Sequence, residues 1–253
     1  MSETNQATSE ADQAMSKTSQ AMSGTNNAAV HLQDVTRVYH QGQVQVHALR
    51  GLTLTIEKGE FTAVCGPSGS GKTTMLNLVG ALDRPTSGSV ILDGVDLNEL
   101  NRKDRSTVRR DRIGFVFQAY NLMPVLTAYE NAELVLWAQG VDIEKRRERV
   151  MALLAEVGLE GMEDRMPSEL SGGQQQRVAI ARAIAPEPSV VLADEPTANV
   201  DSETADKLLA LMEKLNREHG VTFIFSTHDP KVMERARRLV RLVDGAVASD
   251  DKR

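Results

Sequence analysis

The segment from Phe61 to Leu82 restricts the possible folds of this chain more than any other part of the sequence. It begins with a short apolar run, FTAVC, continues as GPSGSGKTT, and then shows the apolar spacing of a helix in TTMLNLVGAL. A strand, a glycine-rich loop of the form G-x-x-x-x-G-K-[ST] and a helix, in this order, are typical of a phosphate-binding loop in an α/β protein. The glycines allow the backbone to wrap closely, so that amide groups and the helix N-terminus face a polyphosphate.

The side chains of this loop support the same interpretation. Lys72 can reach the β and γ phosphates of a nucleotide, and the Thr73 hydroxyl can ligate Mg²⁺. The alternative, a glycine loop with an incidental lysine, is disfavoured by the flanking strand and helix. The residues predicted to bind nucleotide here are Gly66, Pro67, Ser68, Gly69, Ser70, Gly71, Lys72, Thr73 and Thr74.

Strands and helices alternate along the rest of the chain. Apolar runs predict strands near residues 30–39, 46–56, 88–94, 112–118, 189–195, 221–227 and 237–245. Helical patterns occupy residues 119–170 and 202–218. We therefore expect a three-layer α/β domain over residues 31–248, with a helical insertion at about 119–170 and a short tail at 249–253.

Residues 1–30 are polar and repeat every seven residues, as SETNQAT, SEADQAM, SKTSQAM and SGTNNAA. A coiled-coil seam needs bulky apolar residues at two separated heptad positions, which these units lack, so we expect disorder. The segment also lacks the basic start and apolar run of a signal peptide. Elsewhere no apolar run approaches the ~20 residues that would cross a bilayer.

Charge and cysteine content exclude some functions. A net charge of −6 provides no global positive field, which disfavours a nucleic-acid partner. The single cysteine, Cys65, cannot form an internal disulfide and suits a reducing compartment.

Two adjacent carboxylates end the apolar run SVVLADEP. Strand alternation would point Asp194 and Glu195 to opposite sides, which allows two roles. We assign Asp194 to Mg²⁺, through a water because Mg²⁺ sheds its hydration reluctantly, and Glu195 either to positioning the attacking water or to acting as its general base. The alternative is a solvated turn.

Two further strand ends carry polar side chains that we expect at the same sheet edge. His228 follows VTFIFST, where an imidazole N–H can donate to a transferring γ phosphate. Gln118 ends RIGFVFQ and is a candidate for contact with metal or water. For both residues the alternative is an ordinary surface position.

The segment LSGGQQQRVAIARA places Ser171, Gly172 and Gly173 before a helix. Free backbone amides and close approach at glycine would make this a second anion site. Ser171 with Gln174 three residues later is also a capping-box pattern, so an ordinary capped helix remains equally open.

Six segments occur in the order found in ATP-binding-cassette ATPases: GPSGSGKTT, FVFQ, LSGGQQQR, VVLADEP, TANVD and STHD. Over residues 31–246 the chain resembles a nucleotide-binding subunit of an ABC transporter. The resemblance implies a P-loop NTPase (RecA-like) core with an antiparallel β subdomain. It also implies ATP and Mg²⁺ as cofactors, and a homodimer that binds two ATP molecules at its interface.

The resemblance also implies residue roles. Tyr39 would stack on adenine, Gln118 would contact the metal and link the site to a transmembrane partner, and His228 would contact the γ phosphate. Ser171, Gly172, Gly173 and Gln174 would cap the ATP held by the partner's P-loop, and Asp201 would cross the dimer interface.

The segments QAYNLMPVLTAYENAEL and PSELSGGQQQRVAIARA are most similar to the lipoprotein-releasing, macrolide-export and FtsE-like subgroup. This implies a separate permease with an FtsX/MacB-like fold and a position on the cytoplasmic side of the inner membrane, in contact with the membrane through the permease. Ala198 and Ala119 depart from the subgroup pattern. The alternatives are an ATPase that regulates cell-envelope processes and an exporter of small molecules or peptides.

Other classes of ABC protein fit less well. A DNA-repair ATPase would insert long coiled coils after Gln118, a translation factor would carry two cassettes, and a nonenzymatic regulator would lose Glu195 or Lys72. The stretch RKDRSTVRRDR is interpreted as a solvated face, the alternative being contact with lipid headgroups or a permease. The stretch AELVLWAQG, with Trp137, is either core or part of a groove for a permease helix.

Overall fold

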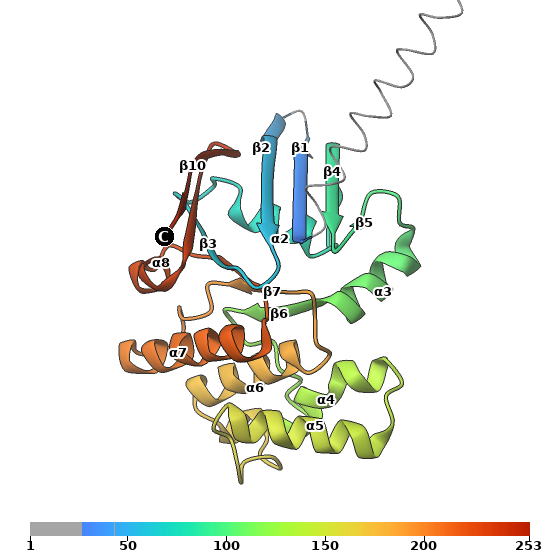
Figure 1. Ribbon diagram of the computed structural model, residues 1–253, viewed down its shortest axis with the longest axis vertical. Helices are drawn as coiled ribbons and strands as arrows, with labels where there is room; N and C mark the ends of the chain where they lie inside the picture. The colour runs from blue at the N-terminus through green and yellow to red at the C-terminus, as the bar shows by residue number, and fades with distance from the viewer. Residues whose placement is uncertain (1–26, 43) are drawn as a thin grey trace, which may run out of the picture.

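The structure is a computed structural model that describes residues 27–42 and 44–253. The described residues form two sheets, and Figure 1 shows most helices on the side of the second sheet that faces away from the first. The expected disorder of residues 1–26 lies outside the described residues. Residues 28–30, which the sequence assigned to that segment, instead begin the first strand, because Ala29 and Val30 are fully buried.

The first sheet is antiparallel, with the strand order β2-β1-β4-β5. Its strands are β1 (Ala28–Gln41), β2 (Val44–Glu57), β4 (Ser87–Leu92) and β5 (Val95–Asp96). β1 and β2 are long and pair along their length, from Ala28 opposite Glu57 to Gln41 opposite Val44. This sheet is the expected antiparallel subdomain.

The second sheet has the order β10-β9-β3-β8-β7-β6, and all neighbours except β9 and β10 are parallel. Its strands are β3 (Phe61–Cys65), β6 (Ile113–Phe117), β7 (Val190–Asp194), β8 (Phe223–Ser226), β9 (Arg238–Val243) and β10 (Ala246–Lys252). Because the parallel strands run the same way, the ends of β3, β6, β7 and β8 meet at one edge.

Helices lie between the sheets and on the far face of the parallel sheet. They are α2 (Lys72–Val79), α3 (Arg102–Arg112), α4 (Ala128–Ala138), α5 (Ile143–Glu156), α6 (Gly172–Ile184), α7 (Ser202–His219) and α8 (Pro230–Arg235), with a 3-10 turn, η1 (Pro167–Glu169). In Figure 1, α4 and α5 lie farthest from the antiparallel sheet, and this is the expected helical insertion. No helix in residues 27–42 and 44–253 is long and apolar enough to cross a membrane.

Successive residues of the parallel strands face two separate cores. In β7, Val190 and Leu192 pack with α2 and the antiparallel sheet, whereas Val191 and Ala193 pack with α6 and α7. A strand that is buried on both faces must be apolar throughout, which explains its unbroken run of apolar residues. The three-layer expectation is confirmed.

Two features at the surface differ from expectation. The residues assigned to a C-terminal tail, 249–253, continue β10 as far as Lys252, which pairs with Arg238 of β9. The sequence did not predict this part of the strand, because most residues of β10 are exposed and its last residues are charged. The basic stretch is helix α3, capped by Asn101; its first half is solvated except at Arg105, which is buried, and residues 108–112 are half-buried.

Candidate functional site

A cavity of about 800 Å³ lies at the edge where the parallel strands end. Most of the residues that the sequence singled out line it, and the lining as a whole comes from six separate parts of the chain. The lining residues are Tyr39, Val46, His47, Ala48, Gly66, Pro67, Ser68, Gly69, Ser70, Gly71, Lys72, Thr73, Thr74, Gln118, Asp194, Glu195, Ser226 and His228.

Packing requires glycine at two positions of the loop between β3 and α2. Gly66 has φ +149°, and a Cβ there would lie 2.1 Å from the carbonyl oxygen of Leu242. Gly71 has φ +100°, and its Cβ would lie 2.6 Å from the carbonyl oxygen of Ala48. Side chains at these positions would therefore push the loop away from β9 and β2.

The start of α2 is suited to an anion. Gly71 precedes the helix without a side-chain cap among the described residues, so the first amides of α2 keep their hydrogen-bonding capacity for a ligand. The buried Ser70 Oγ likewise has no hydrogen-bond partner among these residues. Lys72 Nζ donates to the carbonyl oxygens of Gly66 at 2.8 Å and Pro67 at 3.0 Å, and folds back over the loop. A polyphosphate would satisfy the free amides of α2 and the charge of Lys72, whereas the fully buried Ser70 Oγ is out of reach of a ligand.

The two adjacent carboxylates share the cavity, which corrects the expectation that they point to opposite sides. β7 ends at Asp194, and Glu195 has φ +46°, so strand alternation no longer applies to it. Its amide donates to the carbonyl oxygen of Ser226 at 2.9 Å, which fixes this turn beside β8. The left-handed backbone of Glu195, rather than strand alternation, therefore sets the different orientations of the two carboxylates.

Burial raises the pKa of Asp194, and the nearby Glu195 carboxylate raises it further, whereas a hydrogen bond with Ser226 and the charge of Lys72 act against this shift. A buried carboxylate that is poorly compensated favours a bound cation. Asp194, the Thr73 hydroxyl and the Gln118 amide line one cavity and offer the oxygen ligands that Mg²⁺ prefers. The residues present therefore fit Mg²⁺.

Glu195 is held from two sides. His228 Nδ1 lies 2.6 Å from Glu195 Oε1, and Thr227 Oγ1 donates to Glu195 Oε2 at 3.3 Å. The glutamate side chain is 18% exposed and the histidine side chain 78% exposed, so His228 lies on the open side of the cavity. Sequence reasoning missed Thr227, whose position next to His228 gave no separate signal.

Gln118 is tied to the loop after β7 through Asn199. Asn199 Nδ2 donates to the carbonyl oxygen of Gln118 at 2.9 Å, and Gln118 Nε2 donates to Asn199 Oδ1 at 3.4 Å. The Tyr120 hydroxyl donates to the carbonyl oxygen of Asn199 at 3.0 Å. Neither Asn199 nor Tyr120 was predicted, because partners about 80 residues apart leave no local pattern.

The second predicted anion site lies apart from this cavity in the described chain, since none of its residues lines the cavity. Ser171 and Gln174 form both hydrogen bonds of a capping box, Ser171 N to Gln174 Oε1 at 2.8 Å and Gln174 N to Ser171 Oγ at 3.3 Å. Gly172 and Gly173 are close-packed: added Cβ atoms would lie 2.7 Å from Tyr120 Oη and 2.4 Å from Thr204 Cγ2.

Asp201 also lies outside the cavity lining, at the N-terminus of α7. Its carboxylate accepts from the Thr204 hydroxyl at 2.6 Å and from the Thr204 and Glu203 amides at 3.0 and 3.1 Å. These bonds, the one from the Thr204 side chain above all, lower the pKa of Asp201. The predicted residues thus form two groups, one on the cavity and one around the start of α6 and α7.

Known proteins resemble this chain over most of its length. Residues 49–198 match the family model described as ABC transporter. The chain is 46% identical to an uncharacterized ABC transporter ATP-binding protein, MJ0796, of Methanocaldococcus jannaschii, over 88% of this chain and 97% of that protein. It is 47% identical to the lipoprotein-releasing system ATP-binding protein LolD of Anaeromyxobacter dehalogenans, over 87% and 93%.

Other relatives are longer. The macrolide export ATP-binding/permease protein MacB of Syntrophobacter fumaroxidans is 49% identical over 86% of this chain, which spans only 31% of that protein's length. A solved dimeric structure of the ATP-binding cassette MJ0796, in a post-hydrolysis state with ADP and Pi, matches with a TM-score of 0.81 at 46% identity, over 88% of this chain and 98% of that chain. The chain therefore belongs to the ABC transporter family, as an ATP-binding cassette ATPase.

Proposed function

We propose that two copies of this chain bind two ATP molecules between them, hydrolyse them, and drive a separate transmembrane permease. The observation that carries the proposal is the separation of the two predicted phosphate sites. In one chain the cavity holds Lys72, Asp194 and Glu195, whereas Ser171 and Asp201 lie outside its lining. A second copy would supply the missing side, and the related cassette MJ0796 has been solved as a dimer.

The cavity residues have distinct parts in the proposed reaction. Lys72 leaves the carbonyl oxygens it now contacts and binds the β and γ phosphates, and the free amides of α2 bind the same anion. Glu195 accepts a proton from the attacking water, while Thr227 and His228 hold its carboxylate in place. When bound, Mg²⁺ neutralises charge on the phosphate oxygens, and Asp194, Thr73 and Gln118 would hold it.

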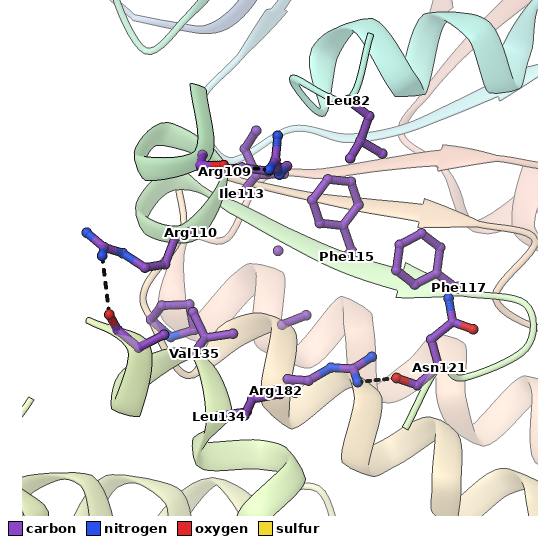
Figure 2. Close-up of a pocket in the computed structure, with 15 residues that line it drawn as sticks. Leu82, Arg109, Arg110, Ile113, Phe115, Phe117, Asn121, Leu134, Val135 and Arg182 are labelled. Carbon is purple, nitrogen blue, oxygen red and sulfur yellow. Dashed lines mark hydrogen bonds between the residues drawn. The ribbon is translucent and has the colours of Figure 1, made fainter. Parts of the chain in front are cut away.

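An apolar cavity of about 490 Å³ supports attachment to a permease. Figure 2 shows Phe115 and Phe117 of β6, Leu134 and Val135 of α4, and Arg182 of α6 around it. The loop after β6, which carries Gln118, borders this cavity through Asn121. An amphipathic permease segment bound here would touch the loop after β6, whose first residue, Gln118, lines the ATP cavity. Trp137, offered from the sequence as part of such a groove, lies outside the lining and is 64% exposed.

Relatives suggest the permease type. The relatives include the ATP-binding protein of a lipoprotein-releasing system and a macrolide export ATP-binding/permease protein. We therefore propose a permease of the FtsX/MacB-like kind and a position on the cytoplasmic side of the inner membrane. An ATPase that regulates cell-envelope processes is the second candidate. Purification from native membranes would identify the permease, and a partner with a different membrane fold would contradict the assignment.

The Glu195→Gln variant tests most directly whether two copies of the chain hold ATP between them. The substitution removes the base but keeps the shape, so we expect turnover to fall by roughly 10² to 10⁴ with ATP binding intact. ATP should then shift this variant from monomer to dimer in size-exclusion chromatography with light scattering. Adding Ser171→Glu should abolish that shift, because a carboxylate would face the partner's γ phosphate.

Glu187→Gln is the matched control, since Glu187 also has a left-handed backbone, φ +51°, but pairs with Arg149 outside the cavity. It should leave hydrolysis unchanged. Near-normal hydrolysis by the Glu195→Gln variant would refute the base assignment. ATP-loaded Glu195→Gln protein that stays monomeric would refute the dimer.

A further inference from the structure

Tyr39 is one of three side chains that form a single bonded cluster beside the ATP cavity. Its hydroxyl donates to Asp83 Oδ2 at 2.8 Å. Arg37 donates to the same carboxylate through two atoms, Nε to Oδ2 at 2.9 Å and Nη2 to Oδ1 at 2.9 Å. The Arg37 guanidinium carbon also lies 4.4 Å from the centroid of the Tyr39 ring. We call Arg37, Tyr39 and Asp83 the Tyr39 cluster.

Asp83 is itself fixed to the end of the P-loop helix. Its amide donates to the carbonyl oxygen of Asn77 in α2 at 3.2 Å, and its carboxylate Oδ1 accepts from the Arg84 amide at 2.7 Å. Tyr39 and Arg37 belong to β1 of the antiparallel sheet. The cluster therefore sets the position of the ring relative to the same helix whose N-terminus faces the phosphates.

The geometry and the partial burial of the Tyr39 cluster favour one orientation of the Tyr39 ring. A two-point arginine–carboxylate bond has directional preference, and a guanidinium over an aromatic ring adds a favourable contact. The Arg37 and Asp83 side chains are 23% and 26% exposed, so water competes with them only in part. The guanidinium covers one face of the ring, while the ring still lines the cavity.

We propose that Arg37 and Asp83 are positioning residues that hold the Tyr39 ring in place to receive the nucleotide base. The inference rests on the proposed ATP site and extends it, because it assigns base recognition to two residues outside the cavity lining. With the ring fixed in advance, less freedom is lost when a base stacks on it. The cluster should therefore favour triphosphates with a purine base over triphosphates without one.

The test compares Asp83→Asn with Asp111→Asn in the full chain. Asp111 accepts a matching two-atom bond from Arg110, at 2.7 and 2.9 Å, but lies outside the Tyr39 cluster and the ATP cavity. We measure kcat and KM for ATP, the Kd of ATP by equilibrium dialysis, and the inhibition constant of inorganic tripolyphosphate.

Asp83→Asn should raise the KM and Kd of ATP about 3- to 10-fold, a loss in the range of one or two hydrogen bonds. It should leave kcat and tripolyphosphate inhibition within about twofold. Asp111→Asn should change none of these values. Tyr39→Phe keeps the ring but loses the bond to Asp83, so the single variant should bind ATP more weakly. In the Asp83→Asn background the same change should cause no further loss of ATP affinity.

Each other outcome overturns the inference. An unchanged Kd for ATP in both Asp83→Asn and Tyr39→Phe would show that the ring needs no support. Equal weakening of ATP and tripolyphosphate would show that Asp83 acts through the P-loop rather than through the base. Failure of the proposed function is separate: the unmodified chain would bind ATP without hydrolysing it, and the Kd comparison would still decide the role of the cluster.

Discussion

At the scale of single residues, the two glycines of LSGGQ are closely packed against side chains of this chain. A Cβ at Gly173 would lie 2.4 Å from Thr204 Cγ2, and Thr204 is held by its hydroxyl bond to Asp201. Gly173→Ala should therefore lower the free energy of unfolding by about 1–3 kcal/mol. Thr204→Ser removes the obstructing methyl and keeps the hydroxyl, so the double variant should recover most of this loss.

Urea denaturation of the two single variants and the double variant measures this coupling. Gly172→Ala with Tyr120→Phe is a parallel pair, because the obstructing atom there is the Tyr120 hydroxyl oxygen at 2.7 Å. Additive effects in both pairs would mean that these glycines are not constrained by the neighbours named here.

Asp194 is expected to reduce the stability of the empty cassette. Its pKa is raised mainly by burial, so the folded protein disfavours the charged form that exists at neutral pH. Asp194→Asn should raise the free energy of unfolding by about 0.5–1 kcal/mol at pH 7, a value reduced for the partial exposure of this carboxylate, while lowering Mg²⁺-dependent hydrolysis. The gain should vanish as the pH falls below the ordinary value of 3.8, where both proteins are neutral at this position.

Asp111→Asn is a control in which the change in the free energy of unfolding should have the opposite sign, because a hydrogen bond from Arg110 lowers the pKa of Asp111. It should lose stability at pH 7. Denaturation curves for both variants without nucleotide decide the point: a stability loss in Asp194→Asn would show that this carboxylate is structurally required.

Residues at strand ends could be predicted from the sequence, since parallel strands bring their ends to one edge. Lys72, Asp194 and His228 meet there as expected. The conformation of Glu195 could not be predicted, because its left-handed turn is fixed by a hydrogen bond to Ser226, 31 positions away. The same holds for Asp83, whose link to Tyr39 joins positions 44 residues apart.

At the scale of elements, α6 fixes the loop that follows β6. Arg182 of α6 donates to the carbonyl oxygens of Asn121 at 2.6 Å and Tyr120 at 2.8 Å. Both loop residues have a left-handed backbone, with φ values of +49° and +60°. Burial lowers the pKa of Arg182, so the two carbonyls compensate an unfavourable desolvation.

Arg182→Met should leave both carbonyls without their donor and lower the free energy of unfolding by about 1–3 kcal/mol. Hydrogen exchange at residues 118–121 should become faster, since the loop loses its attachment to α6. Arg177→Met is a control on the same helix, where one bond to the Val157 carbonyl at 3.1 Å is lost. Equal exchange in the two variants would mean that Arg182 does not fix the loop.

Elements in the interior were easier to predict than elements at the surface. Strands β3, β7 and β8 are buried on both faces, so their sequences are continuously apolar. β10 reads as a charged tail because most of its residues are exposed. Its position depends on Arg238 in β9, which donates two hydrogen bonds to the Asp250 carboxylate. No local sequence pattern predicts that pairing.

At the scale of the whole molecule, the two groups of predicted site residues are arranged around different elements. The P-loop, Asp194 and Glu195 follow strands of the parallel sheet, whereas Ser171 and Asp201 begin helices α6 and α7. Asn199 connects them, since it bonds to Gln118 on the cavity and precedes Asp201 by two positions. Gln118 on the cavity is thus joined to the start of α7 by its hydrogen bonds with Asn199 and by the two chain positions that separate Asn199 from Asp201.

The two sheets are joined by a buried ion cluster around Arg238, which is 6% exposed. Its guanidinium donates to Asp250 of β10, to Glu60 beside β3, and to the carbonyl oxygen of Thr55 in β2. The bond from Arg238 holds the pKa of Asp250 below its ordinary value of 3.8. A depressed carboxylate pKa contributes stability that is complete above the unfolded value and is lost as the pH falls through the folded value.

Asp250→Asn should therefore lower the free energy of unfolding by about 1–2 kcal/mol at pH 7, a value reduced for partial exposure of this carboxylate. The difference from the unmodified chain should stay constant down to about pH 5 and shrink below it, because protonation then removes the same ion pair from the unmodified protein. Asp251→Asn is the control on the same strand, since the Asp251 carboxylate accepts only from Ser249, at 3.2 Å, among the described residues. Urea denaturation at pH 7, 5, 4 and 3 measures both differences, and an Asp250→Asn deficit that is undiminished at pH 3 would show that packing, rather than charge, joins the two sheets at this point.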